Sequence, residues 1–468
     1  MNIPLIIVVG YIVALFVISA FARKLASKGS EDFILAGRKL TTPLVAVTIT
    51  GLAIGGASTI GVSEQAYSVG LAAGWYNVAW AAGAIVMGIV AAAKYRSLNI
   101  STLPELFEKF YDTKGRVICV IGQIIIQLVI TSLQYVAGGA ILASILPEIF
   151  TFKSGMLISA IVFISITFIG GMWSAGLSNL LNVTLIYIGT AVAAIMSILG
   201  QGGMTSIQAK LPAEVPYMHP TAGLGWVVIG GWFAVMITQV LSLQGTVQIS
   251  CGAKDEKSAR KGFILGGLLM IPIGFLSALM GIAARVAFPD ISATMALPQI
   301  IMSLNPVIAG LTLAALWAAD VSTACNLLLG SATLFSQDIY KRFIRPDIDE
   351  KQFMLVTKAS ICALGLLTLL MAFTVVGILK TLLIGLSLTT AFTVVFLFTI
   401  FAPGLCRKNS AFYTTLAGMI VLVLWQFVPA IRVLPHVIYL EWLVCVGVFL
   451  LIPLLDKQSI ASIHEVQA

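Results

Sequence analysis

The sequence predicts an all-α polytopic membrane protein with about thirteen transmembrane helices. Hydrophobic residues make up 59% of the 468 residues and charged residues only 10%, and the mean hydropathy is +1.04. This composition is typical of a chain that crosses a bilayer many times, not of a soluble core. The apolar runs that predict the spans lie at 3–22, 43–69, 74–95, 117–146, 155–173, 179–200, 224–249, 263–288, 307–336, 354–375, 378–403, 411–430 and 437–455.

The placement of the positive charges predicts the orientation of these spans. No positive charge precedes the first run, whereas Arg23, Lys24 and Lys28 follow it, so the run is expected to be a retained helix and not a signal peptide. Most other Lys and Arg residues lie in short loops on one side of successive runs, as in cytoplasmic loops. We therefore expect a multi-pass plasma-membrane protein (the inner membrane of a bacterium) with its N-terminus outside and its C-terminus in the cytoplasm. The net charge of +8 then reflects topology, and no nucleic-acid partner is expected.

The second span contains an interruption. Apolar residues run from Pro43 to Ile54, and Gly55-Gly56 then precede Ser58 and Thr59. Adjacent glycines weaken a helix, and unwound backbone in a membrane must be buried in protein or line a cavity. The carbonyls from Gly51 to Ile54 would then be free to bind a cation, and amides beyond the break could bind a polar solute. The alternative is that these small residues only permit close helix packing.

The ninth span carries a carboxylate and two hydroxyls at membrane depth. Ala319, Ser322 and Thr323 share one face of a helix, and Asp320 lies beside them. Oxygen ligands of this kind suit a small hard cation, and intramembrane ionisable residues are functional candidates by default. The alternative is that the two hydroxyls bond back to carbonyls of their own helix. The interrupted second span would supply the missing ligands.

An enzyme is not expected. Catalysis would need paired acid and base groups or metal ligands at depth, and one intramembrane Asp without a His does not provide them. Other polar residues within spans are mostly expected to form interhelical hydrogen bonds, and a minority are expected to contact a ligand.

Several motifs resemble those of the sodium/solute symporter family. The longest is Ser30-Glu31-Asp32-Phe33-Ile34-Leu35-Ala36-Gly37-Arg38-Lys39-Leu40, which looks like the family pattern S-x-x-F-x-L-A-G-R-x-L. Others follow in family order: Leu103-Pro104-Glu105, Gly170-Gly171-Met172-Trp173, Gly252-Ala253-Lys254 and Ser336-Gln337-Asp338-Ile339-Tyr340. The family includes bacterial proline, galactose and sialic-acid transporters and animal glucose transporters.

This resemblance implies a LeuT-like core of two five-helix inverted repeats that works by alternating access. The implied division is 1–41 (peripheral helix and cytoplasmic loop), 42–200 (first repeat), 201–405 (second repeat) and 406–468 (peripheral helices and tail). It also implies Na⁺ as the coupling ion, bound between the second and ninth spans. By motif, the ligands would be the carbonyls of Gly51, Ile54 and Ala319 and the hydroxyls of Ser322 and Thr323.

The chain departs from the family pattern at positions that affect coupling. Where the family usually has Thr-Asp after the Gly-Gly of the fifth span, this chain has Ser178-Asn179, which puts a second sodium site in doubt. Conversely, Asp320 stands where the family typically has a small apolar residue. We take Asp320 and Asn179 as coupling candidates. Asp320 would serve as a cation or proton site or as counter-ion to an amine; the alternative is a structural or protonated Asp.

The resemblance places the solute beside the break of the second span. The residues that this location offers are Ser58, Thr59, Asn77, Gln134 and Gln244. None is cationic, so a small neutral, zwitterionic or monocarboxylate solute is expected. The function implied is sodium-coupled symport of a small-molecule substrate across the lipid bilayer. The alternatives are a proton-coupled symporter that uses Asp320 and a non-transporting solute sensor or channel. The oligomeric state stays open.

Overall fold

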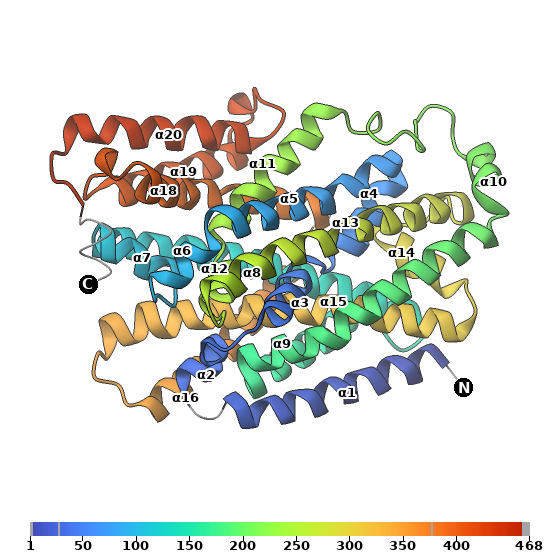
Figure 1. Ribbon diagram of the computed structural model, residues 1–468. Helices are drawn as coiled ribbons and strands as arrows, with labels where there is room; N and C mark the ends of the chain where they lie inside the picture. The colour runs from blue at the N-terminus through green and yellow to red at the C-terminus, as the bar shows by residue number, and fades with distance from the viewer. Residues whose placement is uncertain (1–2, 27–28, 376–377, 461–468) are drawn as a thin grey trace.

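Long, roughly parallel helices build the molecule (Figure 1). The computed structural model describes residues 3–26, 29–375 and 378–460, and within these ranges it contains helices but no named strand. The main helices in chain order are α1 (Ile3–Ala26), α2 (Ser30–Leu35), α3 (Thr42–Ala53), α4 (Val62–Val69), α5 (Trp75–Val90), α6 (Ala92–Ser97), α7 (Leu103–Phe110), α8 (Thr113–Ile145), α9 (Phe152–Gly200), α10 (Gly203–Lys210), α11 (Trp226–Ser242), α12 (Gln244–Cys251), α13 (Glu256–Ala287), α14 (Ala296–Met302), α15 (Pro306–Thr333), α16 (Glu350–Ala372), α17 (Ile378–Ser387), α18 (Thr389–Phe401), α19 (Ser410–Phe427) and α20 (Val437–Leu455). Short 3₁₀ and π segments are η1 (Ala36–Arg38), η2 (Ala57–Gly61), η3 (Gly70–Gly74), η4 (Ala293–Met295), η5 (Leu334–Ile344), η6 (Pro403–Leu405) and η7 (Pro429–Ile431).

The number of spans depends on how continuous helices are counted. By length and composition, ten described helices could cross a membrane, or eleven when the bent pair α11 and α12 counts as one span. The sequence predicted thirteen because two helical runs each contain two expected crossings. One is 57–90, and the other is the 49-residue α9. At 1.5 Å per residue, α9 is far longer than the hydrocarbon layer of about 30 Å. It kinks at Gly171, where φ is +51°, near the end of the first of the two spans expected there.

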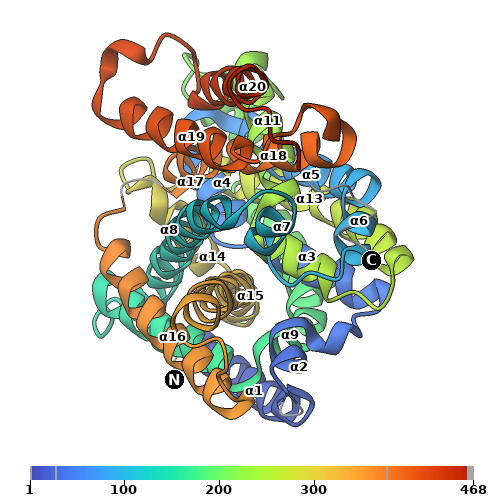
Figure 2. The same ribbon diagram turned by 90° about the vertical axis from the view of Figure 1, so that its left-hand side faces the viewer.

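Helix α15 lies at the centre of the bundle. Figure 2 shows it surrounded by α8, α9 and α16, and α9 and α8 are among its main contacts. In the span that contains α15, 83% of the most apolar window is buried, against 28% for α1. Small residues such as Ala314, Ala315, Ala318 and Ala319 let neighbouring helices approach closely. The candidate ligands Ala319, Ser322 and Thr323 therefore lie on the most buried of the candidate spans found among the described residues.

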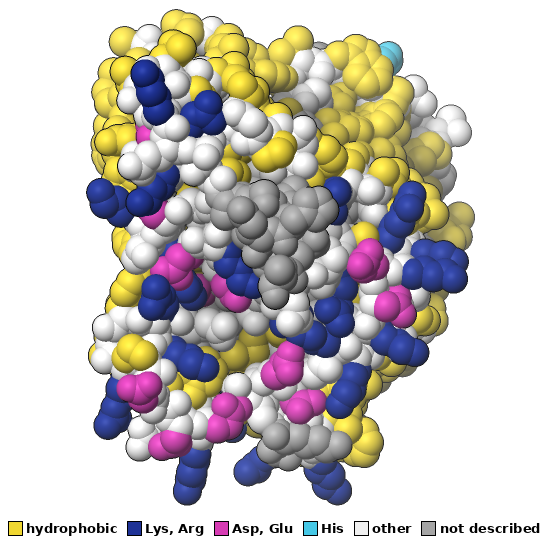
Figure 3. Space-filling view, turned by 60° about the vertical axis from the view of Figure 1, so that its left-hand side comes forward, with side chains coloured by type: hydrophobic (Ala, Val, Ile, Leu, Met, Phe, Trp, Pro, Cys, Tyr) yellow, Lys and Arg dark blue, Asp and Glu magenta, His cyan; other side chains and the backbone are white. Residues whose placement is uncertain are grey.

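The two ends of the bundle differ in charge. Figure 3 shows Lys and Arg side chains, interspersed with Asp and Glu, gathered on the end that faces left in Figure 1. Exposed members of this set include Lys94, Lys109, Lys114, Lys341 and Arg342. Helix α20 ends at this face, whereas α1 begins at the opposite end (Figure 1). This arrangement agrees with an odd number of crossings, which puts the two ends of a chain on opposite sides of the membrane.

Candidate functional site

The second apolar segment is broken, as the sequence predicted. Helix α3 ends at Ala53, and Ile54 leaves the helical region with a ψ of 84°. The chain re-enters helical geometry at Gly56 and continues through η2 into α4. A Cβ on Gly55 would lie 2.4 Å from Thr323 Oγ1, and one on Gly56 would lie 2.4 Å from Ala137 Cβ. The glycines are thus required because α15 and α8 press directly against the backbone of the break.

The break frees carbonyl groups at the end of α3. In a continuous helix, the amide of Gly56 would bond to the Leu52 carbonyl, but it instead donates to Gln134 Oε1 at 2.7 Å. The side chains of α15 take over the unpaired acceptors. Ser322 Oγ lies 2.7 Å from the Gly51 carbonyl oxygen, and Thr323 Oγ1 lies 3.0 Å and 3.1 Å from the Gly51 and Leu52 oxygens. Ser322 Oγ also lies 2.9 Å from the Ala319 carbonyl oxygen.

This oxygen cluster brings together four of the five predicted cation ligands: Gly51, Ala319, Ser322 and Thr323. The Ile54 carbonyl accepts none of these hydroxyl hydrogen bonds, and the Leu52 carbonyl is the group that joins the cluster instead. Both hydroxyl residues are buried. Neutral carbonyl and hydroxyl oxygens are the donors that a small hard cation prefers, and each hydroxyl keeps lone pairs that can turn toward it. The donor set therefore fits Na⁺.

A small cavity of about 20 Å³ adjoins the cluster on the side of the break. Gly55 and Thr323 line it together with Gln134, Tyr76 and Trp80, and apolar side chains complete the wall: Leu52, Ala53, Ala57, Ile130, Leu243, Leu327, Leu382 and Leu386. This volume suffices for about one water molecule. An organic solute would fit only after the surrounding helices move apart, so the described conformation is closed around this position.

The predicted solute residues do not all face this cavity. Gln134 lines it. Ser58 Oγ and Thr59 Oγ1 bond to the carbonyls of Ala53 and Gly55 at 2.5 Å and 3.1 Å, so both side chains stabilise the break itself.

Asn77 and Gln244 lie elsewhere. Asn77 packs close to Gly274 of α13, and its Oδ1 is buried with no hydrogen-bond partner in the described part of the chain. Gln244 begins α12 and bonds to the Leu103 amide and the Ser101 carbonyl at 2.9 Å and 3.3 Å, so it connects helices and lies outside the lining of the cavity. The leucines that line the cavity carried no sequence signal, because an apolar residue in a span resembles any other.

The two coupling candidates lie against the broken segment. Asp320 is fully buried, and neither carboxylate oxygen has a hydrogen-bond partner among the described residues. Its Oδ1 would lie 3.1 Å from a Cβ on Gly56, which places the carboxylate at the break. Asn179 of α9 presses on Gly51, since its Nδ2 would lie 2.5 Å from a Cβ there. Asn182 Nδ2 donates to Asn179 Oδ1 at 3.3 Å.

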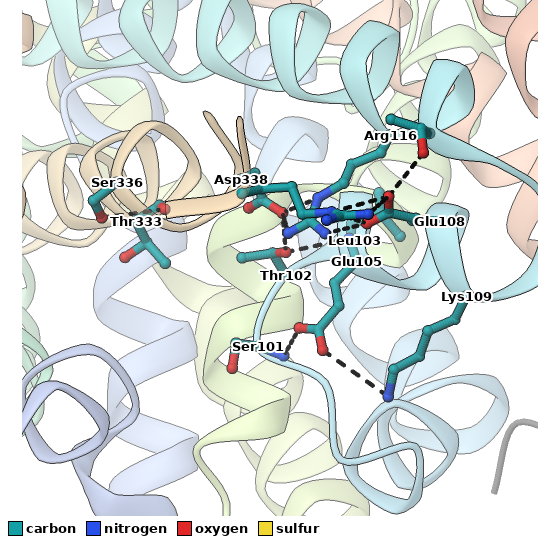
Figure 4. A network of polar contacts seen from close by, with 12 residues as sticks. Ser101, Thr102, Leu103, Glu105, Glu108, Lys109, Arg116, Thr333, Ser336 and Asp338 are labelled. Carbon is teal, nitrogen blue, oxygen red and sulfur yellow. Dashed lines mark hydrogen bonds and ion pairs between the residues drawn. The ribbon is translucent and has the colours of Figure 1, made fainter. Parts of the chain in front are cut away.

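A polar network lies at the Lys- and Arg-rich end of the bundle (Figure 4). Asp338 of η5 is fully buried and accepts from Arg116 Nε at 2.8 Å and from Thr102 Oγ1 at 3.0 Å. Glu108 of α7 pairs with Arg116 and with Arg342, the latter at 2.9 Å. Burial opposes ionisation of Glu108, but hydrogen bonds from Arg342, Arg116 and Thr113 lower its pKa to about 2. The network ties the end of the central helical segment to α7 and α8.

Together, the broken helix, the oxygen cluster at its break and the central α15 define a membrane transporter of the class that couples solute movement to a cation. The model of the sodium:solute symporter family matches residues 33–418, and the chain belongs to this family. Its function is sodium-coupled solute symport, with Na⁺ as the coupling ion. It is a multi-pass membrane protein with a LeuT-like fold, and its curated relatives are transporters.

Individual relatives are distant in sequence but cover most of the chain. A sodium/glucose cotransporter of Vibrio parahaemolyticus is 27% identical over 376 residues, which are 72% of this chain and 68% of the relative. A sodium/proline symporter of Staphylococcus aureus is 23% identical over 444 residues, 89% and 84% of the two chains. The solved outward-open structure of a Na⁺-coupled sialic acid symporter is similar over 99% of both chains, with a TM-score of 0.84 and 19% identity. The nucleobase-cation-symport transporter Mhp1 has a TM-score of 0.61 over 90% of this chain and 92% of its own, at 14% identity.

Proposed function

We propose that this symporter binds Na⁺ at the contact of α3 with α15 and a small polar organic solute beside the break between α3 and η2. The cation ligands are the carbonyls of Gly51 and Ala319 and the hydroxyls of Ser322 and Thr323, and the Ile54 carbonyl joins them when the chain at the break turns. The observation that supports this proposal is the buried contact of both hydroxyls with carbonyls that the helix break has freed.

The solute position rests on the cavity that adjoins these oxygens. Gln134 and the aromatic pair Tyr76 and Trp80 line it, while Ser58 and Thr59 offer hydroxyls at the break. Asn77, whose buried Oδ1 bonds to none of the described residues, becomes a solute contact when α5 and α13 separate. Gln244 is assigned to the contact between α12 and the segment before α7, not to the solute.

The remaining parts of the proposal concern topology. The protein lies in the plasma membrane with the Lys- and Arg-rich end in the cytoplasm, so its N-terminus is outside and its C-terminus is inside. Residues 42–200 and 201–405 form the two inverted repeats, with peripheral segments at 1–41 and 406–468. The curated relatives are symporters, and no enzymatic activity is proposed.

The sodium site is tested by thermal unfolding of the purified protein in sodium and in potassium at equal ionic strength. A cation that binds only the folded state stabilises it by mass action, by about 2.7 kcal/mol at a hundredfold excess over its dissociation constant. We expect a sodium-specific increase in melting temperature in the parent and its loss in Ser322→Ala and Thr323→Ala.

Ser331→Ala is the matched control. It removes a buried hydroxyl from the same helix, but one whose hydrogen bond among the described residues goes to the Leu327 carbonyl at 2.9 Å. The sodium-specific increase should persist in this variant. If Ser322→Ala and Thr323→Ala keep the full increase, sodium does not bind at these hydroxyls.

Asp320 is proposed to strengthen cation binding through its charge. The carboxylate is buried at the break, two residues from Ser322, and no described basic group pairs with it. Buried charges a few Å apart interact by several kcal/mol, so Asp320→Asn should raise the sodium concentration for half-maximal stabilisation by about tenfold, equivalent to about 1.4 kcal/mol.

Glu441→Gln is the control for this change, because Glu441 of α20 is also a fully buried carboxylate but packs on Gly418 of α19, away from the break. It should leave the sodium requirement unaltered. An Asp320→Asn protein with the sodium requirement of the parent would refute the cation role. If Asp320→Asn loses solute uptake but keeps the sodium requirement of the parent, the carboxylate binds the solute and not the cation.

A further inference from the structure

A second and much larger cavity lies at the end of the bundle opposite the Lys- and Arg-rich face. Its volume is about 970 Å³, in the range of known ligand sites. The start of α11, the ends of α16 and α19, and the start of α20 surround it, with Val129 and Ser132 of α8 at its wall.

Helix α17 lies between the large cavity and the small one at the break. Leu379 and Leu383 of α17 line the large cavity, while Leu382 and Leu386 of the same helix line the small one. Trp232 lines the large cavity and Tyr76 lines the small one. Their rings pack edge to face, with 6.2 Å between the ring centroids. A solute that enters from this end therefore passes through the large cavity first.

Among the described residues that line the large cavity, the charge is positive. Arg432 is the charged member of that lining, and no Asp or Glu belongs to it. Its guanidinium is held in place because Nε donates to the Trp425 carbonyl at 2.8 Å and Nη2 to the Gln426 carbonyl at 2.7 Å. Nη1 makes neither of these two hydrogen bonds. An oriented guanidinium is a strong partner for a carboxylate.

His436 adds a neutral donor to the same lining. Its Nδ1 accepts from the Ile438 amide at 3.2 Å, where it caps the start of α20. The proton of the neutral ring therefore resides on Nε2, which is buried and has no described hydrogen-bond partner. Burial lowers the pKa of His436 to about 4, so the ring stays neutral near pH 7. Val437, the first residue of α20, also lines the cavity, and the N-terminal end of a helix attracts anions.

We propose that Arg432, His436 and the start of α20 form a carboxylate-binding subsite on the solute's path to the central site. The inference rests on the proposed function and narrows it: the solute carries a carboxylate, as a monocarboxylate or a zwitterion. Arg432 Nη1 and His436 Nε2 donate to the carboxylate, and Trp232 and Trp425 offer apolar surface to the rest of the solute. Arg432 also caps the carbonyl end of α19, so an effect on folding must be separated from an effect on binding.

The test compares propionate with propionamide, its uncharged counterpart, as stabilisers of the purified full-length protein. It is done in potassium with Ser322→Ala, so that sodium-dependent binding at the central site does not contribute. A single carboxylate should bind in the millimolar range, about −4 kcal/mol. We expect propionate, but not propionamide, to raise the melting temperature at constant ionic strength.

Two further variants identify the donors. Arg432→Ala should raise the propionate concentration for half-maximal stabilisation at least about tenfold. His436→Asn keeps a side-chain cap for α20 but removes the Nε2 donor. It should raise the propionate concentration for half-maximal stabilisation about threefold. The melting temperature measured without propionate should not change.

Equal stabilisation by propionate and propionamide, no stabilisation by either, or unchanged propionate dependence in both variants would overturn the subsite. The sodium experiment with the unmodified Ser322 is independent of these results, so failure of the subsite and failure of the sodium site are distinguishable.

Discussion

Replacing Gly56 by alanine is expected to destabilise the protein by about 1–3 kcal/mol, the usual cost of overpacking, and to abolish sodium-dependent uptake. The backbone of Gly56 is helical, so the conflict is steric. The added methyl group would lie 2.4 Å from Ala137 Cβ, and neither carbon can move by a side-chain rotation. The break must therefore move away from α8, and the oxygens of Gly51 and Leu52 move with it. Melting temperature and sodium-dependent uptake measure the two effects.

A compensating substitution makes this prediction specific. Ala137→Gly removes the atom nearest to the new methyl group, so Gly56→Ala combined with Ala137→Gly should recover most of the stability and uptake. The recovery is offset by about 1 kcal/mol, because a glycine weakens α8. Gly10→Ala, at a site with no atom within 4 Å of the added Cβ, should have no effect. Parent-like behaviour of Gly56→Ala alone would mean that α8 and the break are not in close contact.

Replacing Arg116 by methionine is expected to destabilise the folded state by about 3–5 kcal/mol, because it leaves the buried Asp338 carboxylate without its cation. Asp338 is fully buried and Arg116 is 6% exposed, so water cannot replace the lost partner. The double variant Arg116→Met with Asp338→Asn should recover part of the loss, since an amide carries no charge to bury. Thermal unfolding of the purified protein measures this coupling.

The comparison variant is Arg342→Met. This guanidinium also pairs with Glu108, but its side chain is 48% exposed and Arg116 still contacts Glu108. Exposed ion pairs contribute little, so the loss should stay below about 1 kcal/mol. Equal losses for Arg116→Met and Arg342→Met would show that the buried Asp338 does not depend on Arg116.

The sequence alone determined the class of protein and the pair of segments that form the proposed cation site. Apolar run length identifies membrane spans, and Gly55-Gly56 marks a break, because both properties are local to the chain. The face shared by Ala319, Ser322 and Thr323 follows from helical periodicity. The family motifs linked this face to the broken span, more than 250 residues earlier in the chain.

Other features were decided only by the tertiary structure. The hydroxyl of Thr323 bonds to the carbonyl of Leu52, whereas the sequence predicted the carbonyl of Ile54 as a ligand. Which carbonyl faces the hydroxyl depends on how α3 and α15 are rotated and displaced relative to each other. The same reason places Gln244 against Leu103 and not in the cavity. No local pattern records these relations, and none reveals that the Asp320 carboxylate bonds to none of the described residues or that Arg432 and His436 line one cavity. They exist only once helices distant in the chain have packed together.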